Sequence, residues 1–146
     1  MVLYNPSSRV KGDILSLNPN KVSEAVHTTA IGAFTVAQEA AKRVIPRNHG
    51  TIFFTGATAS VKGLAQSSGF AIGKFAVRGL AQCLARELSP LGIHVANFVV
   101  DGSVKNDPAD DAMVADAIAK SYMAALNQSK VAWSWELELR SKNESF

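Results

Sequence analysis

The sequence contains a single cysteine, Cys83, and this excludes an intramolecular disulfide or a cage of cysteine ligands around a metal. Its three histidines, His27, His49 and His94, are far apart and do not have the spacing of metal ligands. Among the ten glycines, no run has the G-x-G-x-x-G or P-loop arrangement that binds nucleotide phosphates. The sequence therefore predicts no metal site and offers no local dinucleotide-binding motif.

Clusters of positive charge and long apolar runs are also missing. The 15 basic and 12 acidic residues give a net charge of +3, but the basic residues are scattered along the chain. Because binding by counterion release needs clustered lysine and arginine, we expect no nucleic-acid partner. No segment approaches the roughly 20 apolar residues of a membrane span, and the start of the chain has no signal-peptide core. We expect a cytoplasmic protein without a membrane partner.

The residues that are present predict one globular domain over residues 1–146. Hydrophobic residues make up 47% of the chain and charged residues 18%, a balance typical of a domain with a buried core. Short apolar or alternating runs predict β-strands over residues 1–4, 50–56, 93–100 and 133–139. Periodic segments predict helices over residues 19–45 and 68–88, and a third that begins at Asp107-Pro108 with an acidic first turn. This alternation favours a mostly parallel sheet of about four strands, with helices on its faces.

Local signals mark where the two long helices begin and end. Asn18 followed by Pro19 is typical of a helix N-terminus, because asparagine caps the first backbone N–H groups and proline fits the first helical position. Pro46 ends this helix, whose apolar face is rich in alanine. Ser67 or Ser68 is expected to cap the second helix.

Two segments carry a resemblance to a known family. The stretches GTIFFTGATAS, over 50–60, and GFAIGKFAVRGLAQCLARELSPLGIHVANFVVDGSV, over 69–104, resemble the second half of short-chain dehydrogenases/reductases. The similarity extends from Val2 to about Arg140, and FTGATAS together with GF-x-x-GKF resembles a divergent branch of the family. The resemblance implies a truncated Rossmann-like three-layer fold, equivalent to the C-terminal half of such an enzyme and without its NAD(P)-binding half.

The resemblance also implies that most catalytic residues are replaced. In the family, a tyrosine transfers a proton, a lysine lowers the pKa of that tyrosine, a serine holds the substrate oxygen and an asparagine supports a water chain. Lys74 stands at the lysine position, whereas Phe70, Ala57 and Thr29 occupy the tyrosine, serine and asparagine positions. Phenylalanine has no ionisable proton, so Phe70 cannot act as a general acid or base. Lys74 is then expected to be a half-exposed helix cation retained for packing or solubility.

Hydroxyl groups elsewhere in the sequence could replace the missing serine and tyrosine. Thr55, Thr58 or Ser60 could replace the hydroxyl missing from Ala57 if the loop is shifted. Tyr122 could be nominated as a replacement acid, but packing through its ring is the favoured role for a tyrosine on a helix at the edge of the core.

The resemblance places a weak cofactor contact after the third predicted strand. Asp101 stands where the family usually has proline, and Gly102 follows it as the family glycine does. With Lys74, these residues are the candidate cofactor-binding set. We expect no cofactor in the chain alone, and NAD(P) only if a partner completes the site or the site is rebuilt.

Three functions follow. The leading interpretation is a catalytically inactive remnant or scaffold that forms a homodimer through helices 19–45 and 68–88, the pair through which the family commonly dimerises. The second is one component of an NAD(P)-dependent oxidoreductase, in which a partner chain supplies the nucleotide-binding half. Without that half, we expect an unpaired edge at residues 1–5 that is shielded by a second copy of the chain or by a rearranged N-terminus. The third is a small-molecule binding module that uses the cleft at the C-terminal ends of the strands.

Overall fold

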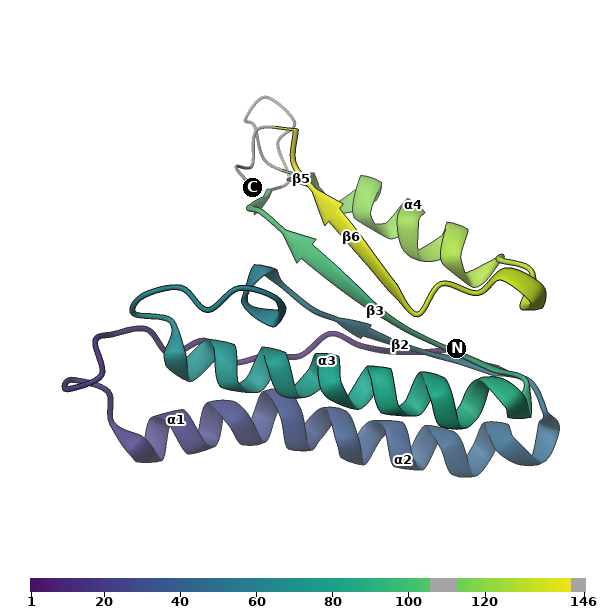
Figure 1. The fold of residues 1–146 in the computed structure, drawn as a ribbon, viewed down its shortest axis with the longest axis horizontal. Helices are drawn as coiled ribbons and strands as arrows, with labels where there is room; N and C mark the ends of the chain where they lie inside the picture. The colour runs from purple at the N-terminus through teal and green to yellow at the C-terminus, as the bar shows by residue number, and fades with distance from the viewer. Residues whose placement is uncertain (106–112, 143–146) are drawn as a thin grey trace.

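A computed structural model of the chain describes residues 1–105 and 113–142. Its central sheet has four strands, and each runs parallel to its neighbours. The order across the sheet is β1 (Val2–Tyr4), β2 (Gly50–Thr55), β3 (Ile93–Asp101) and β6 (Glu136–Arg140) (Figure 1). The parallel α/β architecture predicted from the alternation of strands and helices is confirmed.

The two central strands are apolar because both of their faces are covered. In β2, residues 51–54 are all buried, and in β3 every residue except Val100 is buried. Strands covered on both faces have no reason to alternate between apolar and polar residues. Successive side chains instead enter two separate clusters, with Ile52 and Phe54 in one and Phe53 in the other.

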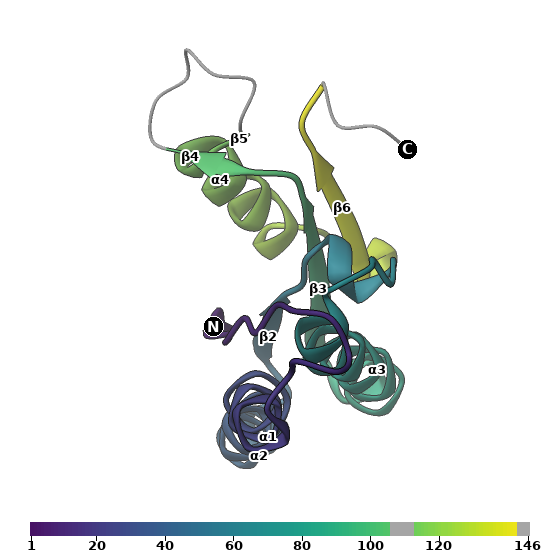
Figure 2. The same ribbon diagram turned by 90° about the vertical axis from the view of Figure 1, so that its left-hand side faces the viewer.

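Helices on both faces of the sheet provide this cover. Alanines of α2 (Gly32–Val44) and α3 (Ser68–Leu88) pack on the cluster that contains Ile52 and Phe54, and α1 (Pro19–Val26) continues the line of α2. Residues of α4 (Ala115–Leu126) pack on the cluster that contains Phe53. Figure 2 shows α4 on the opposite side of the sheet from the other helices.

The helix predicted over residues 19–45 contains a break that the sequence pattern did not indicate. A π-helical turn, His27–Ile31, lies between α1 and α2. The Tyr4 hydroxyl donates a hydrogen bond of 2.5 Å to the Thr28 carbonyl in this turn. A Cβ at Gly32 would lie 2.3 Å from the same hydroxyl, so a larger residue at this position would require the Tyr4 side chain to move. Such turns occur often at functional positions in helices.

The helix boundaries agree with most of the local signals. The Asn18 side chain accepts hydrogen bonds from the backbone N–H groups of Asn20, at 2.9 Å, and Lys21, at 3.4 Å, as expected for an N-cap. Ser67 stands at the N-cap of α3, as predicted, but its side chain makes no capping hydrogen bond with the helix. The helix start predicted at Asp107-Pro108 lies outside the described residues.

The C-terminal part differs from the predicted pattern in two respects. The strand predicted over 133–139 forms over Glu136–Arg140, because the Ser134 backbone N–H donates to the Gln128 side chain at 2.9 Å. Two short strands that were not predicted, β4 (Val104–Lys105) and β5 (Met113–Val114), form a separate parallel pair. Within the described ranges, no helix is long and apolar enough to cross a membrane.

Candidate functional site

A cleft of about 370 Å³ opens at the C-terminal ends of β2 and β3. Its walls come from the loop after β1, the 3₁₀ turn Thr58–Ser60, the start of α3 and the segment that follows β3. The lining residues are Arg9, Ala57, Thr58, Ala59, Leu64, Ser67, Phe70, Val100, Gly102 and Ser103. Open α/β sheets bind ligands at this end of their strands, so this cleft is the candidate site.

Lys74 lies in the core at one side of this cleft. Its side chain is 3% exposed, and its Nζ donates a hydrogen bond of 2.8 Å to the Thr55 carbonyl at the end of β2. Burial disfavours the charged ammonium and lowers the pKa of Lys74 to about 8. Among the described residues, no carboxylate pairs with it. The prediction of a half-exposed cation is therefore wrong: Lys74 is buried and satisfied by a backbone oxygen.

Phe70 lies one helical turn before Lys74 and faces the cleft. Two cations lie over its ring, with the Arg9 guanidinium carbon 5.2 Å and the Lys74 Nζ 5.8 Å from the ring centroid. The sequence has two tyrosines, and their hydroxyls bond to the Thr28 carbonyl and to the Thr55 side chain. No phenolic group therefore reaches Lys74 in place of the missing tyrosine.

Tyr122 is held by packing and by one hydrogen bond. Its ring stacks on Phe98 with centroids 3.8 Å apart, and its hydroxyl lies 2.8 Å from Thr55 Oγ1. Burial raises the pKa of Tyr122, and the hydrogen bond with Thr55 opposes this shift. Thr55 thus contacts both sides of the sheet, because its carbonyl accepts from Lys74 and its hydroxyl bonds to α4.

The other hydroxyl groups near the cleft also form hydrogen bonds within the protein. Ser60 is fully buried, and its Oγ accepts the backbone N–H of Ala57 at 3.0 Å. Thr58 donates its hydroxyl proton to Asp101, although Thr58 does line the cleft. Thr29, at the asparagine position, is 1% exposed within the π-helical turn and accepts the backbone N–H of Ser8 at 3.0 Å. These contacts fix loops around the cleft.

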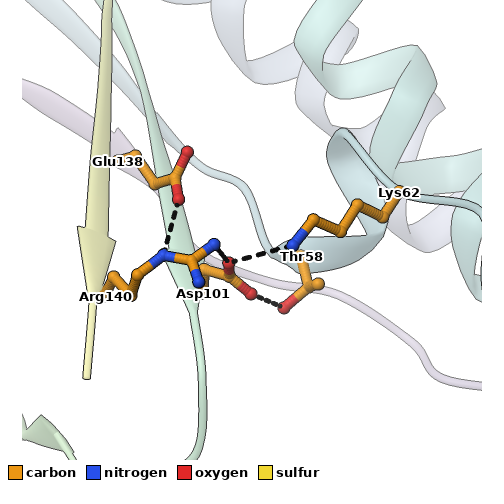
Figure 3. Close-up of polar contacts among 5 residues, drawn as sticks. All are labelled: Thr58, Lys62, Asp101, Glu138 and Arg140. Carbon is orange, nitrogen blue, oxygen red and sulfur yellow. Dashed lines mark hydrogen bonds and ion pairs between the residues drawn. The ribbon is translucent and has the colours of Figure 1, made fainter. Parts of the chain in front are cut away.

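Asp101 is the buried centre of an ion-pair network (Figure 3). One of its carboxylate oxygens accepts from Arg140 and lies 3.9 Å from Lys62 Nζ, and the other accepts from Thr58. Arg140 also pairs with Glu138 at 3.0 Å. Sequence reasoning missed this network. The available signal was the in-register pairing of Asp101 with Arg140, which depends on β6 lying beside β3.

Two of the candidate cofactor-binding residues, Lys74 and Asp101, form hydrogen bonds within the protein. The Lys74 ammonium is directed at a backbone carbonyl, and both oxygens of Asp101 are bonded to protein side chains. Gly102 lines the cleft with a φ of 139°, a conformation that favours glycine. The cofactor assignment therefore stays a prediction.

A second cavity, an apolar groove of about 520 Å³, lies between the start of the chain and α4. Met1 and Leu3 contribute to it and are 63% and 41% exposed, respectively. Thr55 and Tyr122 form part of its wall. Within the described part of the chain, β1 pairs only with β2, so its other edge is unpaired, as the sequence predicted.

The family described as short chain dehydrogenase matches residues 1–112. Among curated proteins, the chain is 27% identical over 94 residues to the 3-oxoacyl-[acyl-carrier-protein] reductase MabA of Mycobacterium avium, covering 64% of the chain and 36% of that protein. It is 31% identical over 113 residues to a 3alpha-hydroxysteroid dehydrogenase of Mediterraneibacter gnavus, covering 77% of the chain and 44% of that protein. The chain thus spans less than half the length of these curated relatives.

Solved structures show the same similarity. A short-chain dehydrogenase from Rhodopseudomonas palustris superposes with a TM-score of 0.83 at 33% identity, covering 94% of the chain and 60% of that protein. An alcohol dehydrogenase from the archaeon Thermococcus sibiricus, complexed with 5-hydroxy-NADP, gives a TM-score of 0.86 at 17% identity, covering 99% and 63%. At the lower identity the similarity concerns the fold alone.

Proposed function

Because this chain belongs to the short-chain dehydrogenase family, we propose that it is a catalytically inactive member that acts by binding and by forming a dimer. One observation carries the proposal. Phe70 takes the place of the proton donor beside the buried Lys74, and both tyrosine hydroxyls of the sequence are bonded elsewhere.

The chemistry of carbonyl reduction explains why this observation matters. A general acid must bring an ionisable proton within about 3 Å of the developing alkoxide, and such a group contributes roughly 10²–10⁴-fold to the rate. Phe70 has no such proton, and Ala57 has no hydroxyl to hold the carbonyl oxygen. Lys74 has lost the tyrosine that it would tune and donates to Thr55 instead.

Turnover measured with NADH and NADPH on small ketones tests the loss of catalysis. We expect no turnover above the buffer reaction from the native chain, and none from Ala57→Ser, which restores a hydroxyl without a proton donor. Turnover by the native chain, with Phe70 in place, would contradict the proposal.

An apolar stripe on the outer surface of α3 supports the dimer. Ile72 and Phe75 are 53% and 43% exposed, and on the same face a Cβ at Gly79 would meet no other atom within 4 Å. On α2, Phe34 is 50% exposed. Exposed apolar surface of this kind marks interaction sites, and a two-fold dimer would pair the stripe with itself.

Sedimentation tests the dimer. We expect the native chain to sediment as a dimer at tens of micromolar and Phe75→Glu to sediment as a monomer. Val131→Glu replaces an equally apolar residue that is 93% exposed outside these helices, and it should stay dimeric. A native monomer at that concentration would overturn this part of the proposal.

The exposed edge of β1 favours a second candidate function. A partner chain that carries a nucleotide-binding half would extend the sheet at β1 and cover Met1 and Leu3, which now line an open apolar groove. The chain would then be one component of an NAD(P)-dependent oxidoreductase. Amide hydrogen exchange distinguishes this candidate, because residues 2–4 should gain protection when a separately expressed nucleotide-binding half of a relative is added. No gain in protection would count against it.

A further inference from the structure

We propose that the cleft beside Phe70 binds a small organic carboxylate with an apolar body, and that Arg9 and the N-terminal end of α3 hold the carboxylate group. The inference rests on the proposed function in one respect, since it assigns a ligand class to a cleft that binds without turnover. Three features carry it: a cation without a carboxylate partner, an uncapped helix end and an apolar wall.

Arg9 supplies the positive charge. It is exposed on the loop after β1, lines the cleft and holds its guanidinium carbon over the Phe70 ring, 5.2 Å from the ring centroid. Among the described residues, no carboxylate pairs with it. A guanidinium held over an aromatic ring by a cation–π contact uses none of its N–H donors for that contact, so they stay available to a carboxylate in a bidentate arrangement.

The N-terminal end of α3 supplies further donors. Ser67 is 8% exposed and lines the cleft, and its hydroxyl makes no hydrogen bond with any residue that the structure describes. The backbone N–H groups of Ser68 and Gly69 also find no partner within that part of the chain, and Gly69 is buried. The first N–H groups of a helix require an acceptor from outside the helix, and the positive end of the helix dipole favours an anion there.

The rest of the cleft is suited to an apolar body. Leu64, Phe70 and Val100 line it, and its volume of about 370 Å³ is in the range of pockets that bind small molecules. The nearby carboxylate of Asp101 does not oppose an anion, because it is buried against Arg140 and Lys62. A single carboxylate on a compact hydrocarbon skeleton matches this lining better than a neutral or a highly charged molecule.

Titration of the full chain with benzoate, followed by amide chemical shifts in NMR spectra, tests the inference. Benzamide serves as the uncharged analogue of the same shape. We expect saturable shifts of the Ser68 and Gly69 amides and an affinity for benzoate at least about tenfold higher than for benzamide. Arg9→Gln should weaken benzoate binding by about tenfold. Arg86→Gln, which changes an exposed arginine in the last turn of α3, should leave the affinity unchanged.

The inference is overturned if benzoate causes no saturable shift at about 10 mM, a concentration that detects even weak sites. It is also overturned if benzamide binds equally well, or if Arg9→Gln binds as the native chain does. The titration contains no nicotinamide cofactor. Loss of benzoate binding would therefore leave the proposed loss of catalysis standing, and turnover by the native chain would leave the carboxylate site standing.

Discussion

Replacing Lys74 with methionine should make the protein more stable at pH 7 and remove a specific pH dependence of its stability. The ammonium is buried, and its pKa falls from 10.5 to about 8 because burial disfavours the charge. A shift of this size corresponds to about 3 kcal/mol of destabilisation when the lysine is protonated in the folded state. The substitution also leaves the Thr55 carbonyl without its donor, which offsets about 1–2 kcal/mol of that gain.

The pH profile separates this cause from general packing effects. Between pH 8 and 10.5 the unfolded chain binds the lysine proton more tightly than the folded chain does. The free energy of unfolding of the native chain should therefore rise with pH through this window, and that of Lys74→Met should not. Burial raises the pKa of Tyr4 and Tyr122, which opposes the rise above about pH 10, but both variants share these residues.

Urea unfolding followed by tryptophan fluorescence, at one protein concentration and at half-unit steps of pH, measures both effects. Lys21→Met, which changes an exposed lysine on α1, is the matched control and should keep the native pH profile. If native chain and Lys74→Met show parallel profiles from pH 8 to 10, the ammonium is not desolvated as described and the reasoning fails.

Three other substitutions test separate contacts. Asp101→Asn should lower the free energy of unfolding by about 2 kcal/mol in urea, because it removes the buried negative charge that accepts a hydrogen bond from Arg140. Gly32→Ala should lower the free energy of unfolding, although alanine in place of glycine usually stabilises a helix interior by about 1 kcal/mol, because the added Cβ would meet the Tyr4 hydroxyl. Tyr4→Phe should reverse this loss of stability in a double-mutant cycle, and additive effects would exclude the contact as its cause. Burial lowers the pKa of His94, so native stability should fall as pH drops below 6.5, and His94→Gln should flatten the fall; an unchanged profile would exclude this cause.

The sequence predicted those parts of the fold that depend on local patterns. Apolar runs located β2 and β3, and the spacing of alanines together with Asn18 located the long N-terminal helix. The range of α3 follows from its apolar periodicity. Each of these signals lies within a few residues of the feature that it predicts.

The contacts around the candidate site depend on distant segments, and this is why the sequence did not reveal them. Asp101 meets Arg140 only because β6 pairs with β3 in that register. Lys74 is buried because the helix that carries it packs across the end of β2, where a carbonyl oxygen is available. Arg9 reaches Phe70 through an irregular loop, for which periodicity gives no signal.

The π-helical turn His27–Ile31 has a consequence for insertions and deletions. It accommodates one residue more than the α-helical turn that it replaces, so the deletion of one residue there would restore a regular α-helical turn and keep the orientation of α2. Ala33 and Ala37 would then still face the sheet. The deletion of one residue within the regular part of α1 or α2 would instead rotate the residues on its two sides relative to each other by about 100°. The π-helical turn is therefore the place in this long helix where a change in length is best tolerated.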